Sequence, residues 1–160
     1  MMRGRLGLAA LVVVLDQASK FAVLRGLQPY QQIPLLPGFN LTLVFNRGAS
    51  FSLLADAGGW QRWLFAGLAV LAGAAIVLLL RRTPPADRCN GYGLALVLGG
   101  AIGNLIDRIW LGQVIDFLDL YYGAWHWPAF NLADSAITVG AALLLLGMTR
   151  PAAPRKAVPR

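Results

Sequence analysis

The feature that most constrains the fold is a series of long apolar segments that contain almost no charge. Residues 63–80 contain no charged side chain, and residues 91–106 contain none, with only Asn104 as a strongly polar group. Residues 132–148 contain a single charged side chain, Asp134. A helix needs roughly 20 mainly apolar residues to cross about 30 Å of hydrocarbon, and each segment is close to that length. These segments therefore predict three membrane-spanning helices.

A fourth apolar segment, "LGLAALVVVL", begins at Leu6 and is interrupted by "DQASK" at Asp16. Two arginines precede it, which gives it the outline of a secretory signal peptide. However, the place where a cleavage site would lie contains Asp16 and Lys20 in place of small neutral residues, and apolar residues resume at Phe21. A retained first helix is favoured. The predicted helices cover about residues 6–26, 60–80, 91–109 and 131–149.

The distribution of basic residues predicts the orientation of these helices. The chain has 14 Lys and Arg residues and a net charge of +7, which raises the possibility of a nucleic-acid partner. With four spans, most of the basic residues fall on one side: Arg3, Arg5, Arg81, Arg82, Arg88, Arg150, Arg155, Lys156 and Arg160. Positively charged loops face the cytoplasm, so both termini are predicted to be cytoplasmic. The basic tail, residues 150–160, then indicates a topology anchor near anionic lipid, and no nucleic-acid partner is expected.

One outer segment, about residues 28–58, has the pattern of β-structure. Apolar and polar residues alternate from Phe39 to Asn46, which is typical of a strand. The following "NRG" supplies turn chemistry, so a small β-hairpin from Phe39 to Leu54 is predicted on the membrane surface. The predicted fold is an all-α membrane protein with four transmembrane helices and a small extracytoplasmic β-hairpin or cradle. It forms a single domain over residues 1–160.

Polar residues recur on one face of the first and third predicted helices. Asp16 and Lys20 are four residues apart and share a face, either as an internal ion pair or as part of a site. Asn104 and Arg108 have the same spacing in the third helix, beside glycines that favour close helix packing. Ionisable groups inside a membrane are expensive and are functional candidates for that reason.

Asp134 admits two interpretations. With Asn131 as the N-cap, Asp134 is the third residue of a capping box, which accounts for an acidic residue in the first turn. Alternatively, it belongs to a site with Asn104, Arg108 and Asp116, because all of these residues are predicted to lie near the outer ends of the helices. Both interpretations remain open from the residues alone.

The residue types narrow the chemistry of such a site. His126 is the only histidine, which excludes a site built on two histidine ligands, and no metal is expected. Cys89 is single and is predicted to be cytoplasmic. Carboxylates remain: two that share a site cannot readily both ionise, so one can activate water while the protonated one polarises a carbonyl. An aspartic peptidase fits this pattern and needs no cofactor. Two alternatives stay open: a Ser–Lys peptidase using Lys20 with Ser50 or Ser135, and a small transporter with a polar path.

Five motifs carry a resemblance to a known family. They are "DQASK" from Asp16, "NRGASFS" from Asn46, "GGAIGNLIDR" from Gly99, "VIDF" from Val114 and "FNLAD" from Phe130. In this order, and within four predicted spans, they resemble the lipoprotein signal peptidases (signal peptidase II), the bacterial membrane aspartic peptidases. The resemblance covers nearly the whole chain.

This resemblance implies both a reaction and a set of site residues. The family cuts prolipoproteins before a cysteine that carries diacylglycerol, releases the signal peptide, and works in the bacterial inner membrane near its outer face. Asp116 and Asp134 would be the catalytic pair, with Asp119 as an ambiguity because it would lie one helical turn from Asp116. Lipidated prolipoproteins and membrane lipids would be the partners of a monomer. Residues implied to line or support the site are Asp16, Lys20, Asn46, Gly48, Asn104, Arg108 and Asn131.

Overall fold

The four apolar segments form helices in the computed structural model, which describes residues 2–48 and 58–149. Helix α1 spans Met2–Gly26, α2 Gln61–Arg82, α3 Arg88–Trp110 and α4 Leu132–Met148. Helices α1, α2 and α3 are long and apolar enough to cross a membrane, whereas α4 is a shorter apolar helix. The predicted helix ranges agree with these bounds to within a few residues at each end.

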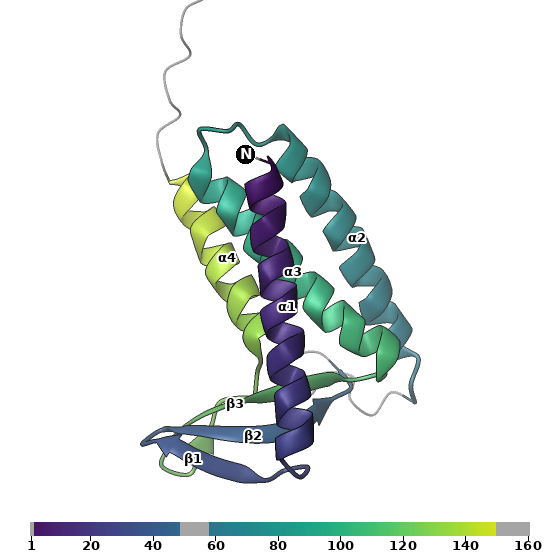
Figure 1. Cartoon of the computed structure of the whole chain (residues 1–160), viewed down its shortest axis with the longest axis vertical. Helices are drawn as coiled ribbons and strands as arrows, with labels where there is room; N and C mark the ends of the chain where they lie inside the picture. Colours follow the sequence, from purple (N-terminus) through teal and green to yellow (C-terminus); the bar gives the residue numbers. More distant parts are fainter. Residues whose placement is uncertain (1, 49–57, 150–160) are drawn as a thin grey trace, which may run out of the picture.

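Helix α3 lies at the centre of the bundle and packs against α1, α2 and α4 (Figure 1). Its glycines permit close approach of the neighbouring backbones. A Cβ atom at Gly93 would lie 2.9 Å from the carbonyl oxygen of Gly140 in α4, and one at Gly99 would lie 2.7 Å from that of Ala9 in α1. Small residues at such contacts are typical of helices that associate without a hydrophobic driving force.

A four-stranded antiparallel sheet lies across one end of the bundle, opposite the N-terminus (Figure 1). Its strands, in spatial order, are β1 (Gln32–Leu36), β2 (Phe39–Asn46), β3 (Val114–Tyr122) and β4 (Trp125–His126). Gly38, with φ of +83°, lies in the turn between β1 and β2, a conformation that favours glycine.

The predicted strand at Phe39–Asn46 is confirmed as β2, and its described partners are β1 and β3. Strand β2 pairs with β1 on one edge, over Phe39–Thr42, and with β3 on the other edge, from Phe39 to Asn46. The distal part of the predicted hairpin, at residues 49–54, lies outside the described residues. Pro34 and Pro37 weakened the pattern of β1, because proline removes a backbone donor from a strand.

The segment that carries Asp116 is a strand, so the expectation that Asp119 lies one helical turn from Asp116 is wrong. Side chains alternate between the faces of a strand, and residues three apart point to opposite sides. Asp119 accepts a hydrogen bond from Asn40 Nδ2 at 2.9 Å and lies 2.9 Å from His126 Nδ1. Asp116 and Asp119 therefore belong to different surroundings.

An apolar cluster fixes the end of α1 against the sheet. Val23 of α1 packs with Leu43 of β2 and with Ile115 and Phe117 of β3, and all four are buried. Asp116 lies between Ile115 and Phe117 on β3, and successive side chains of a strand point to opposite faces. This arrangement orients Asp116 toward the helices.

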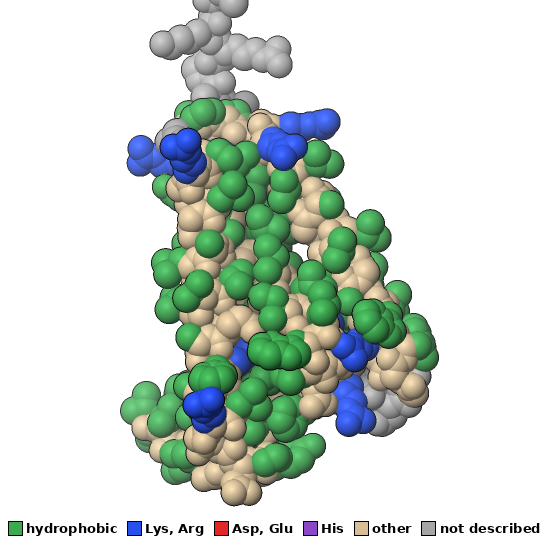
Figure 2. Space-filling model, turned by 45° about the vertical axis from the view of Figure 1, so that its right-hand side comes forward, with side chains coloured by type: hydrophobic (Ala, Val, Ile, Leu, Met, Phe, Trp, Pro, Cys, Tyr) green, Lys and Arg blue, Asp and Glu red, His purple; other side chains and the backbone are tan. Residues whose placement is uncertain are grey.

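The outer faces of the helices are apolar. Large exposed side chains include Val14 on α1 and Leu71 on α2, with 62% and 69% of their surface exposed. Lys and Arg side chains gather toward the two ends of the bundle and leave its middle uncharged (Figure 2). An apolar band between charged ends is what a membrane protein presents to lipid.

Candidate active site

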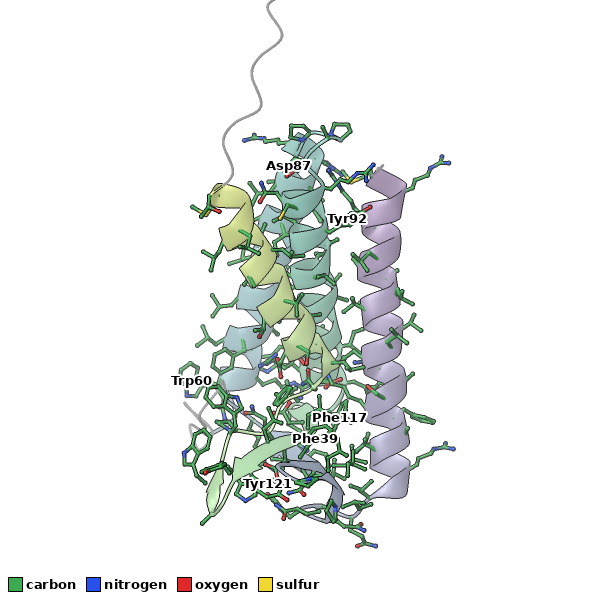
Figure 3. All side chains as sticks on the ribbon, turned by 90° about the vertical axis from the view of Figure 1, so that its left-hand side faces the viewer. Phe39, Trp60, Asp87, Tyr92, Phe117 and Tyr121 are labelled. Atoms are coloured by element: carbon green, nitrogen blue, oxygen red, sulfur yellow. The ribbon has the colours of Figure 1, made fainter. Side chains whose placement is uncertain are left out.

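A cavity of about 720 Å³ opens where α3 and α4 meet the sheet and the segment before α4. Nitrogen and oxygen atoms gather between the helix ends and the sheet, in contrast to the apolar side chains farther along the helices (Figure 3). Five residues of the predicted site line this cavity: Asn46, Asn104, Arg108, Asp116 and Asp134.

Asp116 lies on β3 and is 2% exposed. Its Oδ1 accepts a hydrogen bond from Asn131 Nδ2 at 2.7 Å, and its Oδ2 accepts one from Asn46 Nδ2 at 3.1 Å. Burial, followed by the nearby carboxylate of Asp134, raises the pKa of Asp116 to about 7 against the opposing effect of these hydrogen bonds. Near neutral pH this carboxyl group can therefore gain or lose a proton.

Asp134 lies in the first turn of α4, and both interpretations of it hold. Asn131 and Asp134 form a capping box: Asn131 Oδ1 accepts from the Asp134 N–H at 2.9 Å, and Asp134 Oδ2 accepts from the Asn131 N–H at 3.3 Å. The other oxygen, Oδ1, accepts a hydrogen bond from Asn104 Nδ2 at 2.7 Å, and Asp134 lines the cavity. The capping box thus fixes the direction in which this carboxylate points.

Two asparagines connect the carboxylates. Asn131 Nδ2 donates to Asp116 and, at 3.1 Å, to Asn104 Oδ1, while Asn104 Nδ2 donates to Asp134. The predicted support residues Asn104 and Asn131 are therefore placed together with both aspartates. Amides suit this position because each offers donors at one end and an acceptor at the other.

Arg108 contributes a cation to the cavity. Its Nη1 donates to Asn104 O at 3.3 Å and its Nη2 to Gly48 O at 3.4 Å, and its guanidinium lies 5.4 Å from the ring centre of Phe65. Gly48 is buried, and its N–H donates to Asn46 Oδ1 at 3.0 Å. Gly48 therefore joins the site through its backbone.

Asp16 and Lys20 lie behind the cavity and do not line it. Lys20 Nζ is 2.8 Å from Asp16 Oδ2 and 2.8 Å from Asp107 Oδ2, and it donates to Asn104 Oδ1 at 2.9 Å. Gln17 Nε2 donates to both carboxylates, at 3.2 Å to Asp16 and 2.9 Å to Asp107. We call Asp16, Gln17, Lys20 and Asp107 the Lys20 cluster.

Sequence reasoning missed Gln17 and Asp107. A signal for Asp107 was present, because it lies four residues after Gly103 and therefore shares the face of α3 that turns toward α1. A Cβ at Gly103 would lie 2.6 Å from Asp16 Oδ2, so this face is the one that packs against the acidic residue of α1.

The groups needed by a Ser–Lys peptidase are not brought together among the described residues. Ser135 Oγ donates to Asn131 O at 2.9 Å, and the Lys20 ammonium is held by Asp16, Asp107 and Asn104. Ser50 lies outside the described residues. Cys89 donates to Leu143 O, near the end of the bundle opposite the sheet.

Comparison with known proteins agrees with the family resemblance of the five motifs. The sequence profile of the signal peptidase II family matches residues 8–150. The lipoprotein signal peptidase of Cupriavidus taiwanensis is 54% identical over 145 residues, which cover 91% of this chain and 82% of that protein. The lipoprotein signal peptidase of Burkholderia mallei is 56% identical over 140 residues, which cover 88% of this chain and 84% of that protein.

Solved structures agree. Two bacterial membrane enzymes superpose with TM-scores of 0.82 and 0.81 at 26% and 25% sequence identity. The matches cover 91% and 93% of this chain, and 87% and 94% of theirs. The profile match over almost the whole chain, together with relatives above half identity, shows that this chain belongs to the signal peptidase II family of membrane aspartic peptidases.

Proposed function

We propose that the chain removes the signal peptide from lipid-modified prolipoproteins, with Asp116 and Asp134 as the catalytic pair. The observation that carries this proposal is the arrangement of two carboxylates from different elements at one cavity, joined through Asn131 and Asn104. A carboxylate pair that holds one proton can act as base and acid in the same step.

In the proposed reaction, a water molecule lies between the two carboxyl groups. The ionised carboxylate takes a proton from this water while the protonated carboxyl hydrogen-bonds to the oxygen of the scissile carbonyl and protonates it. The new C–O bond gives a neutral tetrahedral diol. The carboxyl group that took the water proton then protonates the amide nitrogen, while the other carboxylate takes a proton from a hydroxyl of the diol. The C–N bond breaks and leaves a carboxylic acid and the free amine of the lipidated cysteine.

Arg108 and the asparagines orient these groups in the proposal. The guanidinium of Arg108 lies in the cavity wall and offers N–H donors to carbonyl oxygens of the substrate. Asn46, Asn104 and Asn131 donate to the carboxylates and hold them in fixed rotamers. Such positioning contributes to rate because reacting atoms need near-attack geometry.

The proposed setting is the bacterial cytoplasmic membrane, with four spans and both termini in the cytoplasm. Helix α4, with 17 residues, extends about 26 Å at 1.5 Å per residue, close to the thickness of the hydrocarbon. The sheet then lies at the outer face, because the arginines Arg3, Arg81, Arg82 and Arg88 are at the opposite end. A lipid anchor would hold the substrate cysteine at the depth of the cavity.

The test is cleavage of a diacylglyceryl-modified prolipoprotein by the purified protein in detergent. The unlipidated precursor and the variants Asp116→Asn and Asp134→Asn are measured beside it. We expect cleavage of the lipidated form alone and its loss in both variants, with thermal unfolding still cooperative. Cleavage that persists in either folded variant would remove that aspartate from the mechanism.

A double variant separates this mechanism from a Ser–Lys peptidase. Replacing Ser50 and Ser135 together by alanine removes the two hydroxyls that Lys20 would have to activate. The aspartate mechanism predicts that cleavage survives this change.

A further inference from the structure

The Lys20 cluster is unusual because its charged groups are buried and none of them lines the cavity. Asp16 is 0% exposed, Lys20 1% and Asp107 2%. Removing two carboxylates and an ammonium group from water is costly, even when they pair with one another. A purely apolar contact between α1 and α3 would avoid that cost, so the cluster calls for an explanation.

Each carboxylate of the cluster makes a second contact that points toward the active site. Asp16 Oδ1 accepts the backbone N–H of Ala133 at 2.9 Å, and Asp107 Oδ2 accepts the backbone N–H of Ile115 at 3.1 Å. Ala133 immediately precedes Asp134, and Ile115 immediately precedes Asp116. The same cluster therefore holds the backbone one residue before each member of the aspartate pair.

The contact of Asp16 with Ala133 and that of Asp107 with Ile115 are joined to one another within the cluster. Lys20 Nζ lies 2.8 Å from an oxygen of each carboxylate, and Gln17 Nε2 donates to both. A third connection passes through Asn104: Lys20 Nζ donates to Asn104 Oδ1, and Asn104 Nδ2 donates to Asp134 Oδ1. Because hydrogen bonds to charged groups are short and strong, the cluster resists changes in the separation of α4 from β3.

We infer that the Lys20 cluster sets the spacing of the catalytic carboxylates, with Asp107 as the positioning residue of Asp116 and Asp16 as that of Asp134. The inference rests on the proposed function. Asp107 does not line the cavity, and its direct contact with the segment that carries Asp116 is the hydrogen bond from the Ile115 N–H. A displacement of about 1 Å in a catalytic group can lower the rate on the order of 100-fold, so holding the two carboxylates in place supports catalysis.

Two substitutions of Asp107 separate charge from positioning. Asp107→Asn and Asp107→Leu both remove the negative charge, and both leave Lys20 paired with Asp16. Only the asparagine retains an oxygen that can accept the Ile115 N–H. We expect kcat to fall by on the order of 100-fold in Asp107→Leu and by about threefold or less in Asp107→Asn, with KM nearly unchanged in both because the cavity lining is intact.

A role limited to stability predicts a different result. Asp107→Leu would then unfold at a lower temperature, but its folded fraction, measured by active-site titration, would turn over like the wild type. Asp119→Leu is the matched control, because Asp119 is also a buried aspartate, lies on β3 and bonds to Asn40 and His126 outside the cavity. We expect this control to lose stability and to keep its kcat.

A backbone change gives an independent test that leaves every side chain in place. An ester in place of the Val114–Ile115 peptide bond removes the N–H donor and keeps the carboxylate of Asp107. The inference predicts a fall in kcat as in Asp107→Leu, and a wild-type kcat in the ester protein would overturn it. If Asp107→Leu does not fold, the kcat of the ester protein alone tests the inference.

The outcome for Asp116→Asn separates a failure of the proposed function from a failure of the positioning role. Cleavage by folded Asp116→Asn would refute the proposed function itself. An inactive Asp116→Asn, together with wild-type turnover in the folded Asp107→Leu and ester proteins, would refute only the positioning role.

Discussion

Asn131 binds both members of the aspartate pair through a single buried side chain. Its Nδ2 donates to Asp116 Oδ1 at 2.7 Å, and its Oδ1 accepts the backbone N–H of Asp134 at 2.9 Å. Asn131 is thus the N-cap of α4 and at the same time a link to β3. The residue that caps α4 therefore also fixes the distance between the two carboxylates.

These two roles can be separated by Asn131→Ser. Serine is a good N-cap and keeps α4 folded, but it has no amide to donate to Asp116. We expect kcat to fall by about 10- to 100-fold, because Asp116 loses its shorter hydrogen bond. Steady-state cleavage kinetics and thermal unfolding measure the two effects. The control is Asp87→Ser at the N-cap of α3, which should change stability by about 1 kcal/mol or less and leave kcat unchanged.

The pH dependence of cleavage follows from the raised pKa of Asp116. If the pair must hold one proton, loss of that proton ends activity. We expect kcat/KM, which reports on the free enzyme, to fall as the pH rises through about 7, the pKa of Asp116. Bound substrate excludes more water from the cavity, so the same limb of kcat should lie at higher pH. A rise in kcat/KM through pH 7 would show that the pair acts only when fully ionised.

The same pKa gives a prediction for stability. An aspartate whose pKa is higher in the folded protein than in the unfolded chain binds more protons when folded, so its contribution to stability falls as the pH rises between the two values. The free energy of unfolding should therefore decline from about pH 4 to about pH 7 through this group. Asp116→Leu should remove that part of the slope, measured by thermal unfolding in detergent at several pH values.

Removing the ammonium of the Lys20 cluster should be strongly destabilising. Lys20→Met leaves Asp16 and Asp107 buried beside each other without a cation, which we expect to cost about 3–5 kcal/mol of the free energy of unfolding. Arg25→Met is the matched control on the same helix, since Arg25 is exposed and lies over the ring of Phe21; its cost should be about 1 kcal/mol or less. Equal losses in the two variants would contradict the assignment.

An entirely apolar replacement adds a further expectation. Changing Asp16, Lys20 and Asp107 together to Leu, Met and Leu removes all three buried charges at once, and such replacements are often neutral or stabilising. We expect stability to recover and cleavage to remain low, because the backbone N–H groups of Ala133 and Ile115 have lost their acceptors.

The helices were predictable because their signal is local. Uninterrupted apolar runs such as residues 63–80 fix both the position and the length of a helix, and the alternation of Phe39–Asn46 fixes a strand. The pairing of β2 was not predictable, because its partner β3 lies about 70 residues away and its partner β1 contains Pro34. Neighbouring turn residues after Asn46 suggested a local hairpin in place of this long-range pairing.

The residues of the site, like the helices and strands, were predictable only in part. The two catalytic candidates were found because the motifs around Asp116 and Asp134 resemble those of a family. Asp107 was overlooked because a charge beside Arg108 at the end of a helix suggests an exposed residue, and only the packing of α1 on α3 buries it. Its contact with the N–H of Ile115 depends on where β3 begins, which the sequence alone does not specify.

The orientation of the chain can be tested with single cysteines. In a Cys89→Ser background, Pro37→Cys places a thiol in the β1–β2 turn and Pro85→Cys places one between α2 and α3, both at exposed positions. If the sheet faces outward, a membrane-impermeant maleimide added to intact spheroplasts should label the first variant and spare the second. The reverse pattern would place the active site on the cytoplasmic side.

The close contact between α3 and α4 should be sensitive to a single methyl group. A Cβ at Gly140 would lie 2.7 Å from the carbonyl oxygen of Gly93 and 2.7 Å from Val97 Cγ2, and the backbone atom cannot move without shifting the helix. We expect Gly140→Ala to cost about 1–3 kcal/mol of stability, since overpacking forces neighbouring groups apart. Gly67→Ala is the control, because a Cβ on this face of α2 meets no atom of the described residues within 4 Å, and it should be neutral or stabilising by up to about 1 kcal/mol. Because α4 begins at the capping box that orients Asp134, the kcat of folded Gly140→Ala should fall as well, whereas that of Gly67→Ala should not.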